Sequence, residues 1–291
     1  MTLAESATPL PEVSPPAMRT SQPTLQHTQT IQPEWTATPA PTSTPAPSLT
    51  PTEPACWLQG GRYDFTSLKT ELLRYPLDVR VYVPPCYDQQ LDHRYPVLYL
   101  IHGQSFTDDQ WDRLGVDEHL NALIASRELP PFLVVMPRDR EWTQSDQDPF
   151  NKAFMELLLP WVEGTYRTLP DRNYRAVGGL SRGAGWAVHL GLQYWDVFGA
   201  IGAHSLPVFW SDVPSIKAWL NAIPPESMPR IYLDIGDQDR PEILKSATWF
   251  EELLTKQGIS HEWHMFTGYH DEAYWSAHVE QYLRWYAQGF E

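Results

Sequence analysis

The sequence predicts an α/β protein with a doubly wound, mostly parallel sheet and helices on both faces. Two observations carry this prediction. Continuous apolar runs such as PVLYLIHG (96–103) and FLVVMP (132–137) have the composition of strands that are buried on both faces of a parallel sheet. Helical patterns alternate with these runs along the chain, which is typical of β–α–β units.

Two earlier strands, GRYDFT (61–66) and LDVRVYV (77–83), predict an antiparallel hairpin that turns near residue 71. The chain contains two cysteines, and Cys56 and Cys86 are equally far from this turn. Antiparallel pairing places such residues side by side, so we expect a disulfide between them. A disulfide indicates an oxidising compartment. The alternative is two unrelated core thiols.

The remaining elements are expected to alternate up to the carboxyl end, with no internal repeat and no second linker. The expected elements are a helix over 111–129, a helix over 153–168 with a possible kink at Pro160, a strand over 174–179, a helix over 187–194, a strand over 199–205, a strand over 231–236, a helix over 248–258, a strand over 260–266 and a closing helix over 277–286.

The first part of the chain differs from the rest in composition. Residues 1–54 are dominated by Pro, Thr, Ser and Ala, as in TATPAPTSTPAPSLTPTEP, and hold too few large apolar residues to offset the entropy of ordering. We expect a disordered linker or stalk there, which spaces one globular domain over 55–291 from a wall or membrane. A tail without a role is the alternative.

Charge and hydropathy exclude other classes. A formal net charge of -15 argues against a nucleic-acid partner, because such partners are bound through a basic face. No run approaches the about 18 apolar residues of a membrane span. No phosphate loop, metal-ligand cluster or dinucleotide fingerprint occurs, so neither cofactor nor metal is implied. The start, MTLAESATPL, lacks signal-peptide features, yet the stalk and the disulfide favour an extracellular or cell-surface location, with a leader removed or misassigned.

The stretch GGLSRG follows the apolar residues Ala176 and Val177 and precedes a helix-compatible run. A serine on a sharp strand–turn–helix needs small residues two positions away on each side, and Gly179 and Gly183 stand there. The helix N-terminus favours a developing negative charge. The sequence therefore predicts that Ser181 is a nucleophile; the alternative is a flexible glycine-rich connection.

A base and an acid are expected downstream, in the order nucleophile, acid, base. His270 lies in FTGYHDEAYW, between the last strand and the last helix, and is the predicted base, with His204 as the alternative. Asp239 follows IYLDIG in a loop that can reach over the sheet edge, and it is the predicted acid, with Asp237 as the alternative. Asp271 is expected to cap the final helix.

The motifs YLIHG with a following DDQW, VGGLSRG, LDIGDQD and GYHDEAYW occur in this order. Together they resemble the esterase family of α/β-hydrolases, which includes esterase D, feruloyl esterases, enterochelin esterases and the antigen 85 mycolyltransferases. The resemblance covers about residues 60–288. It implies the α/β-hydrolase fold and a Ser-Asp-His triad formed by Ser181, Asp239 and His270.

The same resemblance implies that the backbone N–H groups of Gln104 and Arg182 form an oxyanion hole. Many members carry a second glycine after the elbow, where this chain has Ala184. This small change leaves the turn feasible.

Two long aromatic segments, 137–150 and 205–227, follow strand ends and are expected to cover the site. Their aromatic rings are suited to stacking on a sugar or an aromatic acyl group, although they could instead pack the loops onto the domain. The expected substrate contacts are Trp142, Phe209, Trp210 and, beside the base, Tyr269.

The sequence thus favours a serine esterase that hydrolyses carboxylic esters of carbohydrates or phenolic acids. Its partner would be a small-molecule or polysaccharide ester, with possible tethering to the cell surface through the stalk. One alternative is an acyltransferase to a sugar hydroxyl, which would use the same serine. The other is a catalytically silent binding protein on the same fold.

Overall fold

The structure, a computed structural model, describes residues 55–290. The predicted stalk over 1–54 lies outside the described residues. Eight strands form one sheet in the order β1-β2-β4-β3-β5-β6-β7-β8. The strands are β1 (Arg62–Leu68), β2 (Leu77–Val83), β3 (Val97–Ile101), β4 (Leu133–Pro137), β5 (Arg175–Leu180), β6 (Ala200–His204), β7 (Arg230–Gly236) and β8 (Glu262–Phe266). The helices are α1 (Gln110–Arg113), α2 (Val116–Ala125), α3 (Phe150–Ala153), α4 (Leu159–Thr165), α5 (Arg182–Gln193), α6 (Val213–Ala222), α7 (Pro241–Lys256) and α8 (Glu272–Ala287).

The sheet is mostly parallel, as predicted. β1 and β2 pair antiparallel, with Arg62 opposite Val83, and β2 pairs antiparallel with β4, whereas all other neighbours are parallel. The hairpin brings Cys56 and Cys86 together in a disulfide with a Cα–Cα distance of 5.0 Å. The predicted hairpin and disulfide are therefore confirmed.

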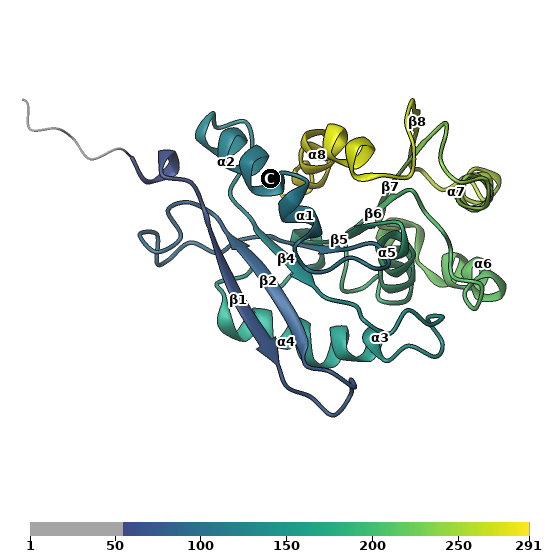
Figure 1. The fold of residues 1–291 in the computed structure, drawn as a ribbon, viewed down its shortest axis with the longest axis horizontal. Coiled ribbons are helices and arrows are strands. Elements are labelled where there is room, and N and C mark those ends of the chain that lie inside the picture. Colours follow the sequence, from purple (N-terminus) through teal and green to yellow (C-terminus); the bar gives the residue numbers. More distant parts are fainter. Residues whose placement is uncertain (1–54, 291) are drawn as a thin grey trace, which may run out of the picture. The chain divides into compact units, whose positions relative to one another are not determined.

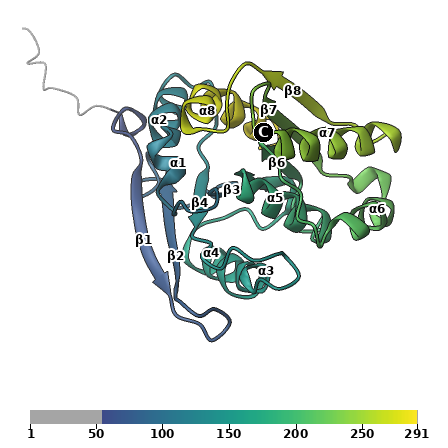
Figure 2. The same ribbon diagram turned by 45° about the vertical axis from the view of Figure 1, so that its right-hand side comes forward.

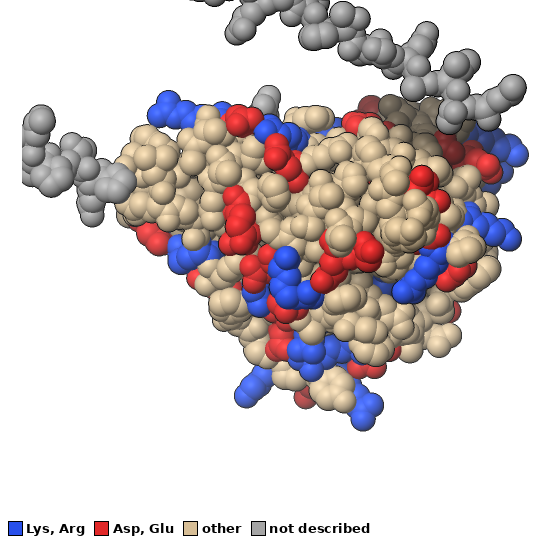
Figure 3. All heavy atoms as spheres, turned by 45° about the horizontal axis from the view of Figure 1, so that its top comes forward, with Lys and Arg blue, Asp and Glu red and all other residues tan. Residues whose placement is uncertain are grey.

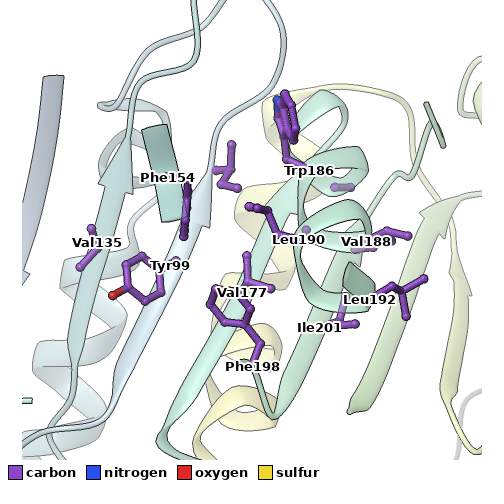
Figure 4. Close-up of a cluster of buried hydrophobic side chains, with 14 of the residues drawn as sticks. Tyr99, Val135, Phe154, Val177, Trp186, Val188, Leu190, Leu192, Phe198 and Ile201 are labelled. Carbon is purple, nitrogen blue, oxygen red and sulfur yellow. The ribbon is translucent and has the colours of Figure 1, made fainter. Parts of the chain in front are cut away.

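Helices cover both faces of the sheet (Figures 1 and 2). Alternate residues of the inner strands belong to two separate cores. Tyr99 belongs to the core that includes residues of α3 to α7, while Leu98 and Leu100 belong to the core that includes residues of α1, α2 and α8. Figure 4 shows part of the first core, where Trp186 and Leu190 of α5 lie over the strands. Burial on both faces explains why the central strands are continuously apolar.

The helix predicted over 111–129 is wrong as a single element. Gly115 adopts a left-handed conformation with φ 92° and separates α1 from α2. A residue with a side chain would be strained there, so this glycine ends one helix and starts another.

Two further expectations need correction. The helix predicted over 153–168 begins earlier and includes a π-helical turn, η2 (Phe154–Leu158), directly before α4 and Pro160. Proline lacks an N–H group, and the wide turn accommodates the missing helical bond. The aromatic segment 205–227 is not a continuous loop, because it contains α6.

The face drawn in Figure 3 carries acidic and basic side chains interspersed over a mostly uncharged surface. Exposed charges are often paired, as Arg284 is with Glu128 and Glu280. Water screens such exposed pairs and they add little to stability, so the two cores dominate it. Among the helices of residues 55–290, none has the length and hydrophobicity needed to cross a membrane.

Reduction of the Cys56–Cys86 disulfide should destabilise the domain, because it releases a constraint across 30 residues of the unfolded chain. The chain-entropy relation gives roughly 3–4 kcal/mol, or a loss of roughly 10 °C in melting temperature. Calorimetry with and without reductant measures this. The Cys56→Ser/Cys86→Ser double variant should melt like the reduced protein and ignore reductant; equal melting of parent and double variant would contradict the expectation.

Candidate active site

Ser181 lies on a strained turn between β5 and α5. Its φ of 51° is rare for a residue with a side chain. A Cβ atom on Gly179 would lie 2.3 Å from the backbone of Gly183, and one on Gly183 would lie 2.0 Å from the carbonyl oxygen of Ile101. The turn is thus closed against the end of β3 and requires glycine at both positions, as the sequence predicted.

The side chains of the predicted triad meet beyond the carboxyl ends of the strands. His270 Nε2 lies 2.9 Å from Ser181 Oγ, and His270 Nδ1 lies 3.0 Å from Asp239 Oδ2. The Asp239 side chain is fully buried, and the His270 side chain is 8% exposed. Asp239 Oδ1 also accepts a hydrogen bond from the N–H of Arg240, at 2.6 Å. The carboxylate is therefore held toward the imidazole from two sides.

The alternative residues make other contacts. Asp237 is exposed and accepts a hydrogen bond from the N–H of Gly268, at 3.1 Å. His204 is fully buried and lies 2.6 Å from Asp234 through Nδ1 and 3.1 Å from the Tyr286 hydroxyl through Nε2. Neither arrangement reaches the Ser181 hydroxyl.

Asp271 caps α8, as expected. Its side chain accepts a hydrogen bond from the N–H of Tyr274, at 3.0 Å. This cap fixes the start of the helix that directly follows His270.

Chemically, this arrangement suits acyl transfer. Nε2 can accept the serine proton while a carboxylate at Nδ1 holds the imidazole tautomer and stabilises the imidazolium. Arg182 is the first residue of α5, so its N–H has no acceptor within the helix. A Cβ atom on Gly103 would lie 3.5 Å from Ser181 Cβ, so the segment that contains Gln104 passes beside the serine.

The Arg182 side chain is buried and fully engaged. Its guanidinium lies 2.6 Å from the carboxylate of Asp139 and 2.6 Å from that of Asp148, and it donates to the carbonyl of Thr143 at 2.8 Å. Burial and the neighbouring Asp139 raise the pKa of Asp148 to about 6, although Arg182 opposes this shift. The guanidinium therefore anchors the 138–149 segment to α5. Only the backbone N–H of Arg182 is left for a substrate.

The structure separates the predicted substrate contacts. Trp142, Trp210 and Tyr269 are 47%, 81% and 59% exposed, and they follow β4, β6 and β8. Phe209 is 5% exposed and packs against Trp186 with a centroid distance of 4.9 Å. Phe209 thus belongs to the core under the segment, and the prediction that it contacts substrate is corrected. Its apolar neighbours bury it, whereas Trp210 is exposed to solvent.

Sequence reasoning missed two features of the site. Phe106 follows β3 and is 36% exposed, which adds an aromatic side chain at a fourth strand end. Trp275 packs against the His270 ring at 4.9 Å, and its Nε1 donates to Ser205 Oγ at 3.1 Å. An aromatic residue shortly after HGQS was a usable signal for Phe106, but no local pattern marks Trp275 as a support of the base.

A hollow of about 830 Å³ lies away from Ser181. It is lined by Arg230, Ile231 and Trp285 and lies beside the amino end of β7, whereas Ser181 follows the carboxyl end of β5. Within residues 55–290, no three His, Cys, Asp or Glu side chains are arranged to hold a metal ion. This hollow therefore does not contain Ser181, Asp239 or His270.

A sequence model of the family described as "Putative esterase" matches residues 70–286, so the chain belongs to this esterase family. An endo-1,4-beta-xylanase/feruloyl esterase of Xylanibacter ruminicola is 28% identical over 62% of this chain and 26% of its own length. An esterase of Mycobacterium tuberculosis is 26% identical over 71% of this chain and 55% of its own length. The chain thus spans about half or less of these relatives.

Solved structures share the fold. A ferulic acid esterase aligns with a TM-score of 0.70 and 24% identity, over 80% of this chain and 99% of that one. The feruloyl esterase module of Clostridium thermocellum, complexed with sinapinate, aligns with a TM-score of 0.67 and 18% identity, over 82% of this chain and 94% of that one. With the sheet order described above, these similarities establish the α/β-hydrolase fold.

Glycine-to-alanine substitutions should have opposite effects at two sites. Gly183→Ala should destabilise by more than about 3 kcal/mol, or move the serine, because the rigid end of β3 blocks its Cβ. Gly164→Ala in α4 should stabilise by about 0.5–1 kcal/mol, since no atom lies within 4 Å of its added Cβ. Urea unfolding measures both; a neutral Gly183→Ala with full activity would contradict the closed turn.

Proposed function

We propose that this protein is a serine esterase that hydrolyses carboxylic esters through an acyl-Ser181 intermediate. The observation that carries the proposal is the continuous Asp239–His270–Ser181 chain, with distances of 3.0 and 2.9 Å. Membership of the esterase family supports it.

The proposed reaction begins when Ser181 Oγ attacks the ester carbonyl and gives its proton to His270 Nε2. The carbonyl oxygen becomes an oxyanion, which the N–H groups of Gln104 and Arg182 bind. When the carbonyl re-forms, the bond to the leaving alcohol breaks, and His270 protonates that alcohol. Water then attacks the acyl-enzyme with His270 as base, and the second collapse returns the proton to Ser181.

We further propose an ester of a phenolic acid with a carbohydrate as the substrate class. The exposed aromatic rings of Phe106, Trp142, Trp210 and Tyr269 follow four different strands on the edge that carries Ser181. Aromatic faces stack on both phenolic rings and sugar rings. Several similar proteins are named feruloyl or ferulic acid esterases, which agrees with this class.

Hydrolysis is proposed over acyl transfer because the site is open. Ser181 is partly exposed, and Trp142 and Trp210, on the segments that flank it, are 47% and 81% exposed. A transferase must keep water from the acyl-enzyme, whereas these side chains are themselves in contact with solvent.

We also propose an extracellular or cell-surface location, with residues 1–54 as a tether for the domain that follows. The Cys56–Cys86 disulfide supports this, because such bonds persist in oxidising compartments.

Substitutions in the triad test the chemistry. Ser181→Ala should lower kcat for p-nitrophenyl acetate by several orders of magnitude without unfolding the protein, since the covalent route is lost. Asp239→Asn should cost more than Asp237→Asn, because only Asp239 contacts the imidazole. Steady-state kinetics measures both. Activity of Ser181→Ala within tenfold of the parent, or a larger loss at Asp237, would sink the assignment.

The substrate class is tested by the preference for methyl ferulate over p-nitrophenyl acetate. Trp142→Ala and Trp210→Ala should each lower this ratio of kcat/KM by about two- to tenfold, the worth of one aromatic contact. Phe65→Ala is the matched control, because Phe65 is an exposed aromatic residue of β1 (65%). Unchanged ratios in both tryptophan variants would refute the role of these rings.

Chromatography of the products with millimolar xylose present distinguishes water from a sugar as the acceptor. Free ferulic acid should remain the main product. An excess of feruloyl-xylose over free acid would contradict the proposed hydrolase activity and favour an acyltransferase.

A further inference from the structure

We propose that His102 and Asp139 are positioning residues that hold the two N–H groups of the oxyanion hole in register. This inference rests on the proposed function. The two donors belong to segments far apart in the chain, since Gln104 follows β3 and Arg182 begins α5. Something must fix their separation, because donors act only within a few tenths of an ångström of the developing charge.

The His102 ring is buried, with 2% of its surface exposed, and both of its nitrogens are used. Nε2 lies 2.9 Å from the backbone N–H of Asp139, and Nδ1 lies 2.7 Å from the carbonyl oxygen of Gly103. A backbone N–H can only donate, so Nε2 accepts, and Nδ1 carries the proton that it donates to Gly103. Burial lowers the pKa of His102, which keeps this neutral tautomer in place.

The bond to Gly103 acts directly on the first donor. The Gly103 carbonyl and the Gln104 N–H are two ends of one planar peptide group, so a fixed oxygen fixes the direction of the N–H. The N–H of Phe106 donates to the same oxygen at 3.2 Å. Hydrogen bonds to the carbonyl also polarise the amide and strengthen its N–H as a donor.

Asp139 carries the connection to the second donor. Its carboxylate is 1% exposed and accepts hydrogen bonds from Arg182 Nε at 2.6 Å and from Trp186 Nε1 at 2.8 Å. Both donors are on α5, the helix whose first N–H is that of Arg182. One residue thus holds His102 through its backbone and the start of α5 through its side chain.

The topology explains why Asp139 lies in the loop after β4. β3 lies between β4 and β5 in the sheet, so the loop after β4 can reach over the end of β3 to the turn at Ser181. A buried ion pair such as Asp139–Arg182 costs much desolvation energy and is weak evidence for stability. Its connection to both sides of the oxyanion hole gives it a role in alignment.

The test compares binding of the tetrahedral state with binding of the substrate. A trifluoromethyl ketone forms a hemiketal with Ser181: the serine oxygen bonds to the carbonyl carbon, the serine proton moves to His270, and the ketone oxygen becomes an oxyanion. Its Ki reports the oxyanion hole, whereas KM for the matching ester reports the remaining contacts.

The variants separate the two bonds of His102. His102→Gln can still accept from Asp139 but has no donor at the Nδ1 position, whereas His102→Asn keeps that donor and cannot reach Asp139. We expect His102→Gln and Asp139→Asn to lower kcat and raise Ki in parallel by about 10- to 100-fold, with KM within about threefold. His102→Asn should lose far less than His102→Gln.

His189→Gln is the matched control. It removes a similarly buried imidazole of α5, 3% exposed and 2.9 Å from Asp212, without touching residues 102–104. Its ratio of Ki to KM should equal that of the parent. Equal losses in His102→Gln and His102→Asn, or a KM that rises while Ki/KM stays constant, would overturn the inference. If Asp139→Asn fails to fold in thermal melts, the two His102 variants decide alone.

The same ketone separates this inference from the proposed function. If the parent forms the adduct and Ser181→Ala does not, the serine mechanism stands whatever His102 does. If the parent forms no adduct, the proposed function itself fails.

Discussion

The closed turn at Ser181 is the constraint on which the rest of the site depends. Gly179 and Gly183 must nearly touch, and Gly183 must also pass against the carbonyl of Ile101. This contact forces Ser181 into φ 51° and starts α5 at the next residue. The strain is sustained because β3 and β5 are paired along their length and cannot separate. One local geometry thereby positions both the Ser181 hydroxyl and an N–H group that has no acceptor within the helix.

The parallel sheet brings the partners to this turn. β7 and β8 end beside each other, so the loops that follow them place Asp239 and His270 together. A buried carboxylate holds the base-bearing side of the site: Asp234 accepts hydrogen bonds from the hydroxyls of Tyr274 and Tyr282 at 2.6 and 2.7 Å. Both tyrosines belong to α8, so this carboxylate ties the helix that follows His270 to β7.

A cluster of buried charges lies beside Ser181. Asp139, Asp148 and Arg182 form one group there. Each buried charge in it has a partner, as the cost of an unpaired buried charge requires. The two apolar cores supply stability that offsets the desolvation cost of this cluster. The cluster in turn fixes the loop that carries the exposed Trp142.

The sequence by itself determined the strand–serine–helix turn, the order of the three residues of the proposed triad, the mostly parallel sheet and the cysteine pairing, because each depends on neighbours along the chain or on simple strand geometry. Tertiary structure alone decided which side chains are buried and which side chains of different elements contact each other. Phe209 and Trp210 are adjacent and both aromatic, yet one is in the core and the other in solvent. His102 and Asp139 meet because β3 and β4 are neighbours in the sheet. No local pattern encodes such contacts, since burial and hydrogen-bond partners depend on residues that are distant in sequence.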